Sequence, residues 1–409
     1  MAGLVAGSLA LRFEQLGTAL WGDEGISIGI ASHPLGDLAD VLARDGSPPL
    51  YYVLLRGWMG VVGRSETQTH ALSLILALAT IPLGLWAGWS LFGRRVGWTL
   101  AVLAATNPFL TEYSGETRMY TLVALLALVA TASFVHGFAF DRRRYLPLFF
   151  GSLLLLLYTH YWGLYFAVAA ALGLVPCFFA SDDRRRLLRD ACLGFAAVAL
   201  FYLPWLPTFL EQQRHTGAPW SWAPAPREAL SALAYALGDR RERVLVALVL
   251  TAGVALVPLV RAIRGREGAA VAGIALLGSL PLAAGWMVSQ MKPNWAQRYL
   301  AIVLPPLLLL AALGIVRSKV PGIVALVIIL LIWVQPLDRL TGARPAIDPE
   351  GQSPDRRLAS VVRPHLTPGD VVVAMQMEEV PVLRYYLGPR FQFADPTGPV
   401  RDPQLVDWR

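Results

Sequence analysis

Three carboxylates gather in a short stretch that follows the first apolar segment of the chain. Asp23 and Glu24 come directly after that segment, within Trp-Gly-Asp-Glu-Gly, and Asp45 follows within Arg-Asp-Gly-Ser-Pro-Pro-Leu-Tyr-Tyr. Carboxylates close to hydrocarbon are costly unless they are solvated or used in function. A carboxylate positioned beside a substrate hydroxyl can act as a general base. The structural alternative is that these acids start a helix, where the helix dipole favours negative charge.

Basic and aromatic residues form three further polar clusters between apolar segments. The first contains Arg118, whose guanidinium could pair with a phosphate; the alternative is a salt bridge from Arg118 to Glu116 or Glu112. The other two clusters are Tyr-Thr-His-Tyr-Trp, around residue 160, and Lys-Pro-Asn-Trp-Ala-Gln-Arg-Tyr, from residue 292. A histidine at a helix end is more often structural than catalytic, and Trp and Tyr are also typical of an interfacial belt.

The elements that must position these clusters are membrane-spanning helices. The chain has 409 residues, of which 56% are hydrophobic and 15% charged, whereas soluble domains have about 25% charged residues. A helical span needs about 20 mostly apolar residues, and continuous apolar runs do not fit the alternating pattern of a membrane β-barrel. We predict about eleven spans, at 2–20, 68–91, 97–111, 119–138, 145–162, 163–180, 191–210, 244–261, 269–290, 299–316 and 320–336.

Arginines indicate which way the spans are oriented. Each even-numbered span is followed by a short basic loop, such as 142–144 and 184–186, and basic loops are typically cytoplasmic. The acidic and aromatic clusters then all lie on the opposite, outer face. This placement also accounts for the net charge of +7 without a nucleic-acid partner, because the arginines attract lipid head groups. The first span is thin, so we expect a longer native first helix.

The last part of the chain has a different character. Residues 337–409 are polar and punctuated by Pro and Gly, with a turn at 368–370, a strand at 371–373 and a short helix at 380–387. We therefore predict a membrane domain, 1–336, with an outer-face loop at 21–67, and a small soluble α/β tail, 337–409. The two cysteines, Cys177 and Cys192, indicate neither a disulfide framework nor a metal site.

Together the polar motifs resemble those of the GT-C glycosyltransferases. The resemblance is carried by Asp-Glu after the first span, Pro-Pro-Leu-Tyr-Tyr about twenty-five residues later, and Tyr-Ser-x-Glu-x-Arg-Met-Tyr before the fourth span, with Thr-His-Tyr and Arg-Tyr further on. The most similar branch is the protein O-mannosyltransferase-like family with its bacterial relatives, including the aminoarabinose transferases of lipid A. The resemblance covers residues 15 to about 310. Gly115 and Ser47 depart from the pattern, which bears on the acceptor and not on the fold.

The resemblance implies a fold, a reaction and a set of roles. The fold would be an all-α polytopic GT-C membrane domain in a bacterial inner membrane, with its active site facing the extracytoplasmic side. A sugar would move from a polyprenyl-phosphate donor to an unidentified acceptor, with Asp23 as general base and Glu24 or Asp45 orienting it or the acceptor. The donor phosphate would be held by Arg118 with Arg298 or Lys292. The substrate-binding residues would be Tyr51, Tyr113, Glu116, Tyr120, His160, Tyr161 and Tyr299.

The donor carries its own energy, so no nucleotide cofactor is expected. The three acids Asp23, Glu24 and Asp45 could hold a divalent metal, but relatives of this branch generally work without one. The main competing interpretation is a transporter or flippase of lipid-linked sugars, and a second is a non-catalytic member of the family. A transport path would place charges inside the spans, whereas here the spans are nearly free of charge and the acids gather at one surface, which favours surface chemistry.

Overall fold

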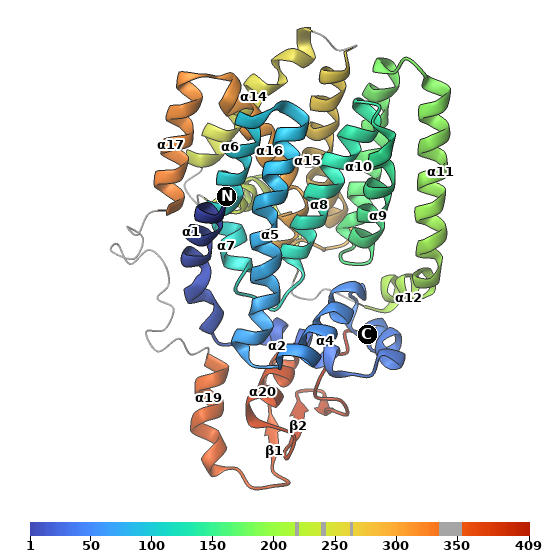
Figure 1. Ribbon diagram of the computed structural model, residues 1–409. Coiled ribbons are helices and arrows are strands. Elements are labelled where there is room, and N and C mark those ends of the chain that lie inside the picture. The colour runs from blue at the N-terminus through green and yellow to red at the C-terminus, as the bar shows by residue number, and fades with distance from the viewer. Residues whose placement is uncertain (217–220, 239–242, 262–264, 335–353) are drawn as a thin grey trace.

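The computed structural model describes residues 1–216, 221–238, 243–261, 265–334 and 354–409. Most of these residues form a bundle of helices whose axes run roughly side by side, and a smaller unit at the C-terminal end lies below the bundle (Figure 1). The molecule is therefore a helical membrane domain with a small α/β unit packed at one end.

Each of the predicted spans coincides with a helix. Five segments of the described residues are both long and apolar enough to cross a membrane: 66–92, 120–139, 162–180, 184–215 and 266–291. The helices at the eleven predicted positions are α1 (Ala2–Phe13), α5 (Glu66–Phe92), α6 (Arg94–Thr106), α8 (Tyr120–Phe134), α9 (Leu146–Leu157), α10 (Trp162–Ala180), α11 (Arg184–Tyr202), α14 (Arg243–Arg261), α15 (Arg266–Met291), α16 (Leu304–Arg317) and α17 (Val320–Val334).

Several predicted span limits differ from the helix ends, such as the end of the first span, which lies at Phe13 and not at residue 20. Two of the differences have local reasons. The third span ends at Thr106 and not at residue 111, because Asn107 caps a new helix, α7 (Pro108–Tyr113), by accepting a hydrogen bond from Leu110 N at 3.0 Å. The seventh begins at Arg184, where Asp183 caps the first turn by accepting from Arg186 N. Side-chain caps of this kind favour a helix start whatever the hydropathy of the residues that follow.

Helix α8 lies at the centre of the bundle and positions the site. It is buried along almost its whole length, and a π-helical turn, η3 (Val135–Ala139), continues it. Near its far end the ring of Phe134 packs against two glycines of neighbouring helices, with Cβ positions on Gly173 and Gly273 only 3.0 Å and 2.9 Å from ring carbons. Tight packing along α8 fixes the position of its first residue, Tyr120, along the axis of the bundle. It fixes the position of Arg118, just before Tyr120, in the same way.

The predicted outer loop, 21–67, is folded into helices that lie at the lower end of the bundle (Figure 1). They are α2 (Gly22–Ser32), α3 (Leu38–Asp45) and α4 (Leu50–Val62), and Pro49 is the residue that precedes α4, as the two prolines predict. The short helices α12 (Leu206–His215) and α13 (Pro226–Ala236) come from the loop that follows α11.

The C-terminal unit confirms the predicted strand and helix. Its elements are α19 (Pro354–Val362), β1 (Val371–Val373), α20 (Val380–Leu387), β2 (Gln392–Asp395) and β3 (Gly398–Pro399). β1 pairs with β2 in parallel and β2 with β3 antiparallel. A small core forms between α19, α20 and β2, from Ala359, Val380, Leu383, Leu387 and Phe393. The predicted boundary at 336 lies outside the described residues.

A candidate active site between the bundle and the C-terminal unit

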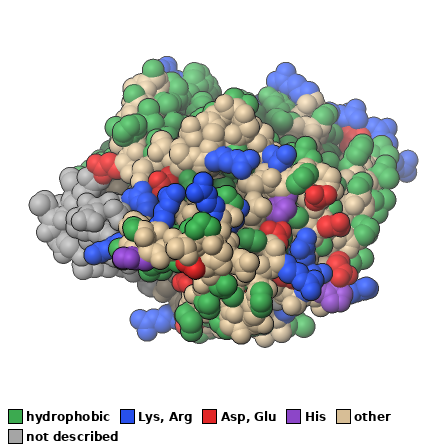
Figure 2. All heavy atoms as spheres, turned by 90° about the horizontal axis from the view of Figure 1, so that it is seen from below, with side chains coloured by type: hydrophobic (Ala, Val, Ile, Leu, Met, Phe, Trp, Pro, Cys, Tyr) green, Lys and Arg blue, Asp and Glu red, His purple; other side chains and the backbone are tan. Residues whose placement is uncertain are grey.

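A cavity of about 780 Å³ opens where α2, α3, the start of α8 and the C-terminal unit meet. Acidic and basic side chains both gather over this face of the molecule, as Figure 2 shows from below. The cavity brings together residues that are far apart in the sequence. The predicted site residues that line it are Asp23, Asp45, Tyr113, Arg118, Tyr120, His160, Tyr161, Lys292, Arg298 and Tyr299.

Asp23 lies between two arginines in the cavity. Its Oδ2 is 3.5 Å from a terminal guanidinium nitrogen of Arg118 and 3.2 Å from one of Arg298. The side chains are only partly exposed, 20% for Asp23 and 11% for Arg118, so solvent screens these charges less than at the surface. Asp23 is in the first turn of α2, where the helix dipole also favours a carboxylate.

Arg118 is oriented by α2 and not by its own loop. One terminal nitrogen donates to Asp23 O at 3.2 Å and to Ser27 Oγ at 3.1 Å. The alternative, a salt bridge to Glu116 or Glu112, is not formed in the described part of the chain: Arg118 N donates to Glu116 O, and Glu112 accepts a bond from Tyr235. Burial acts to lower the pKa of Arg118, but Asp23, Tyr120 and Tyr52 together outweigh it, so the pKa is raised well above its ordinary value.

Both arginines retain an unused donor. The Nε atoms of Arg118 and Arg298 are buried and have no hydrogen-bond partner among the described residues. A buried donor without a partner costs about 1–3 kcal/mol, and this cost disappears when an acceptor enters the site. The two guanidiniums can therefore bind an anion without giving up the contact with Asp23.

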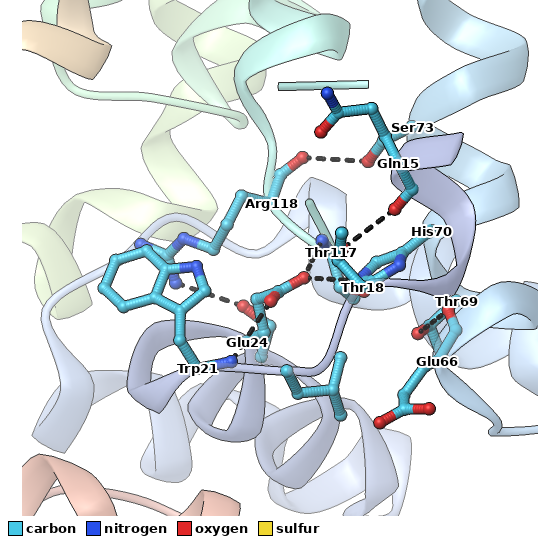
Figure 3. Close-up of polar contacts among 12 residues, drawn as sticks. Gln15, Thr18, Trp21, Glu24, Glu66, Thr69, His70, Ser73, Thr117 and Arg118 are labelled. Atoms are coloured by element: carbon cyan, nitrogen blue, oxygen red, sulfur yellow. Dashed lines mark hydrogen bonds and ion pairs between the residues drawn. The ribbon is translucent and has the colours of Figure 1, made fainter. Parts of the chain in front are cut away.

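Glu24, the neighbour of Asp23, does not line the cavity and lies among Trp21, Thr117 and His70 (Figure 3). Its Oε1 accepts from Thr117 N at 2.6 Å and from His70 Nε2 at 2.7 Å, and its Oε2 accepts from Trp21 N at 3.2 Å. The side chain is 1% exposed. Glu24 thus connects the start of α2, the helix α5 and the loop that carries Arg118, and its placement favours a positioning role over contact with substrate.

His70 completes this buried network. Its Nε2 faces Glu24, and its Nδ1 lies 3.1 Å from Leu16 O. Because both ring nitrogens face acceptors, the arrangement is satisfied by the doubly protonated imidazolium. Glu24 and His70 are therefore a buried ion pair at the base of the site.

Two other predicted substrate-binding residues also lie off the cavity. Tyr51 is fully buried in the protein core. Glu116 has a buried Oε2 with no hydrogen-bond partner among the described residues. Burial, followed by the charges of Glu24 and Glu112, raises the pKa of Glu116 well above its ordinary value, which favours the neutral acid.

Asp45 lines the cavity from the end of α3. Its Oδ2 is buried without a hydrogen-bond partner among the described residues, and the chain turns directly after it at Gly46, whose φ is +96°. Burial raises the pKa of Asp45 to about 6, although Ser47 and the charge of Arg118 act in the opposite direction. A carboxylate with such a pKa can hold or release a proton near neutral pH.

Aromatic residues and one histidine form the wall near α8. His160 Nδ1 accepts from Trp162 N at 3.1 Å, so in the neutral ring the proton is on Nε2. The His160 ring stands edge-on to Tyr299, with 4.7 Å between centroids, and Tyr120 lies 6.3 Å from His160 and 6.5 Å from Tyr299. At the rim, Lys292 donates to Gln213 O at 2.9 Å.

Several residues of the site were missed from the sequence. Gln212 is buried, accepts from Tyr161 and donates to Ser47 O at 3.1 Å, and so connects the loop after α11 with the turn after Asp45. His70 was also missed, although a histidine in an apolar segment is a signal for function. Glu378 and Trp408 line the cavity from the C-terminal unit, and no local motif marks them.

The fold of this chain matches solved structures over nearly its whole length. ArnT from Cupriavidus metallidurans bound to undecaprenyl phosphate has a TM-score of 0.68 at 16% identity, covering 98% of this chain and 86% of that one. The same protein in the apo state has a TM-score of 0.69 at 15% identity, with the same coverage. The chain has the GT-C fold.

A more distant GT-C structure agrees. The oligosaccharyltransferase of Archaeoglobus fulgidus in its apo form has a TM-score of 0.60 at 11% identity, covering 97% of this chain and 64% of that one. No family model matches the sequence, and neither does any curated protein. The GT-C likeness therefore concerns architecture, and residue roles are argued below from the geometry of the cavity.

Proposed function

We propose that this GT-C protein is a membrane glycosyltransferase that moves a sugar from a polyprenyl-phosphate donor to an acceptor at the outer face of the membrane. The observation that supports it most is the convergence of Arg118 and Arg298 on Asp23 in one cavity. The cavity therefore contains a carboxylate that can accept a proton, Asp23, beside two guanidiniums that can bind an anion, Arg118 and Arg298. ArnT, which shares the fold, was solved with undecaprenyl phosphate bound.

The two arginines would hold the donor phosphate. In the reaction the bond between the sugar carbon and the phosphate oxygen breaks, and charge develops on the departing polyprenyl phosphate. Arg118 and Arg298 are fixed beside that position and each has an unused Nε donor, so they can stabilise this charge without reorganising. Lys292, at the rim, adds a third positive charge to the phosphate side.

Asp23 would act as the general base on the acceptor hydroxyl. The arginines contact its Oδ2, and the side chain is 20% exposed in the cavity, so Oδ1 would take the proton as the acceptor oxygen bonds to the sugar. Asp45 lies in the same cavity and would orient the acceptor. We propose that no metal takes part, and expect turnover to survive a chelator.

The proposal is tested by incubating the purified protein with a panel of polyprenyl-phosphate sugars and measuring release of polyprenyl phosphate. Asp23→Asn keeps the shape of the side chain but cannot take a proton, so turnover should fall 10²- to 10⁴-fold with donor binding retained. Asp40→Asn, an exposed acid of α3, is the matched control. Near-normal turnover of Asp23→Asn would indicate that Glu24 or Asp45 is the general base. Binding without release by the wild type would favour the flippase.

The side of the membrane is tested separately. Helix α2, which lines the cavity, lies at the bundle end opposite the basic loop between α5 and α6 (Figure 1). In a protein with Cys192 replaced by Ser, a cysteine at the exposed Leu35 should react with an impermeant reagent added outside, and one at the exposed Arg95 should not. The reverse labelling would place the cavity in the cytoplasm and exclude the proposed outer-face reaction.

A further inference from the structure

The C-terminal unit is packed directly on the helix that carries Asp23. Two glycines of α2 allow backbone contact: a Cβ on Gly25 would lie 2.5 Å from Val382 N, and a Cβ on Gly29 would lie 1.8 Å from Gln404 O. Real Cβ atoms do not approach other atoms so closely. Only glycine therefore permits this docking, and the place of the C-terminal unit is fixed relative to α2.

Polar contacts hold the unit at both ends of α2. Near its start, Tyr386 donates from its hydroxyl to Glu66 Oε1 at 2.7 Å and accepts from Leu20 N at 2.8 Å. At its end, His33 Nε2 lies 2.9 Å from Asp402 Oδ2. The unit is thus held against α2 by bonds as well as by shape, which makes it part of the site.

Two residues of the unit reach the cavity, and each is placed beside one of the two cavity acids. The backbone oxygen of Glu378 is 3.1 Å from a Cβ position on Gly22, the residue before Asp23. Trp408 N donates to the carbonyl of Arg44, the residue before Asp45, at 3.1 Å. Glu378 and Trp408 both line the cavity, and they belong to the C-terminal unit, which lies below the bundle (Figure 1).

We propose that Glu378 and Trp408 form the acceptor-facing wall of the cavity and determine which acceptor is used; this rests on the glycosyltransferase function proposed above. The phosphate side of the cavity is formed by arginines, whereas this side offers an indole ring and a carboxylate. An aromatic face packs against the apolar face of a ring, and a carboxylate accepts hydrogen bonds from hydroxyls. The acceptor class that fits is the carbohydrate part of a glycan or glycolipid. The part of the acceptor that contacts this wall carries no negative charge.

The test separates transfer to the acceptor from reaction of the donor with water. The donor is the radiolabelled polyprenyl-phosphate sugar selected in the panel, and the acceptor source is an extract of envelope glycans and glycolipids. Glu378→Gln and Trp408→Ala should each lower transfer to the extract about tenfold, the usual size of losing one well-packed contact. Hydrolysis of the donor and the KM for the donor should stay within about twofold. Trp408→Phe keeps an aromatic ring and should recover most of the transfer.

Matched glycine variants report whether docking itself matters. Gly29→Val places a side chain against Gln404 O, whereas Gly60→Val on α4 meets open space. The first should make the unit more sensitive to protease and lower transfer, and the second should do neither.

Two results would overturn the inference while leaving the proposed function intact. In one, both wall variants transfer as well as wild type. In the other, they lose donor hydrolysis and transfer equally, which would show a role in folding or positioning alone. If the wild type releases no polyprenyl phosphate from any donor, the proposed function fails, and the inference falls with it.

Discussion

The buried pair of Glu24 and His70 gives the sharpest stability prediction. Glu24 receives hydrogen bonds from Thr117 N, His70 Nε2 and Trp21 N, and it is 1% exposed while His70 is fully buried. Removing one partner of a buried ion pair costs about 3–5 kcal/mol, because the remaining charge has no counter-charge and no water. We expect Glu24→Gln and His70→Leu each to lower the free energy of unfolding by about this amount.

The double variant decides whether the two residues act as a pair. Glu24→Gln/His70→Leu removes both charges, so its loss should be smaller than the sum of the single losses, with a coupling of about 1–3 kcal/mol. Unfolding is followed by titrating the detergent-solubilised protein with a denaturing detergent and recording Trp fluorescence. The control pair is Glu211→Gln/His215→Leu, which removes an exposed acid–histidine pair on α12 and should cost little.

The same variants separate a positioning role of Glu24 from a catalytic one. If Glu24 only orients Asp23 and Arg118, the folded fraction of Glu24→Gln should lose turnover in parallel with His70→Leu, because both variants loosen the same contact. If Glu24 takes the proton, Glu24→Gln should lose turnover by 10²-fold or more while His70→Leu keeps most of it. Additive stability losses, or a turnover loss confined to Glu24→Gln, would refute the positioning argument.

Two further outcomes are expected from the cavity. Arg118→Lys should weaken donor binding about ten- to a hundredfold, because an ammonium cannot reproduce the fixed fork of donors; equal donor affinity in the folded fraction would contradict the phosphate role. For Asp45, whose pKa burial raises to about 6, the unfolded chain releases its proton at about pH 4, before the folded protein does. The free energy of unfolding should therefore fall as pH rises from about 4 to about 6, by on the order of 3 kcal/mol. Asp45→Asn should remove that slope, and an unchanged slope would show that other groups cause it.

Much of the architecture follows from local patterns in the sequence. Apolar runs of span length predicted where the membrane helices lie, since such runs have one stable form in lipid. The strand at Val371–Val373 and the helix at Val380–Leu387 were also predicted and are confirmed, because a turn at Gly369, with φ +99°, separates α19 from β1. Errors arose at helix ends such as Asn107 and Asp183, where one side-chain cap outweighs hydropathy.

The membership of the site could be predicted only in part. Arg118 and Arg298 carry charge beside predicted spans, and Asp45 carries charge in the predicted outer loop; such charges are conspicuous in an apolar chain. Gln212 and Trp408 reach the cavity through long-range packing, which leaves no pattern in their neighbours along the chain. A tail of about seventy residues has a marginal core, which predicts that it packs on the membrane domain. The surface on which it docks could not be predicted, because Gly25 and Gly29 reveal their role only when the backbone opposite them is known.

The adjacent acids Asp23 and Glu24 show why a motif does not assign roles by itself. Successive residues of an α-helix point about 100° apart, so two neighbours in the first turn of α2 cannot face the same space. One must point to the cavity and the other into the protein. The structure places Asp23 between Arg118 and Arg298, and Glu24 on His70. Each of the two carboxylates is therefore paired with positive charge: Asp23 with the two arginines, and Glu24 with His70. Glu24 stabilises the start of α2, and this helix start positions Asp23. Glu24 also binds Thr117 in the loop that carries Arg118, and Arg118 is the arginine that contacts Asp23.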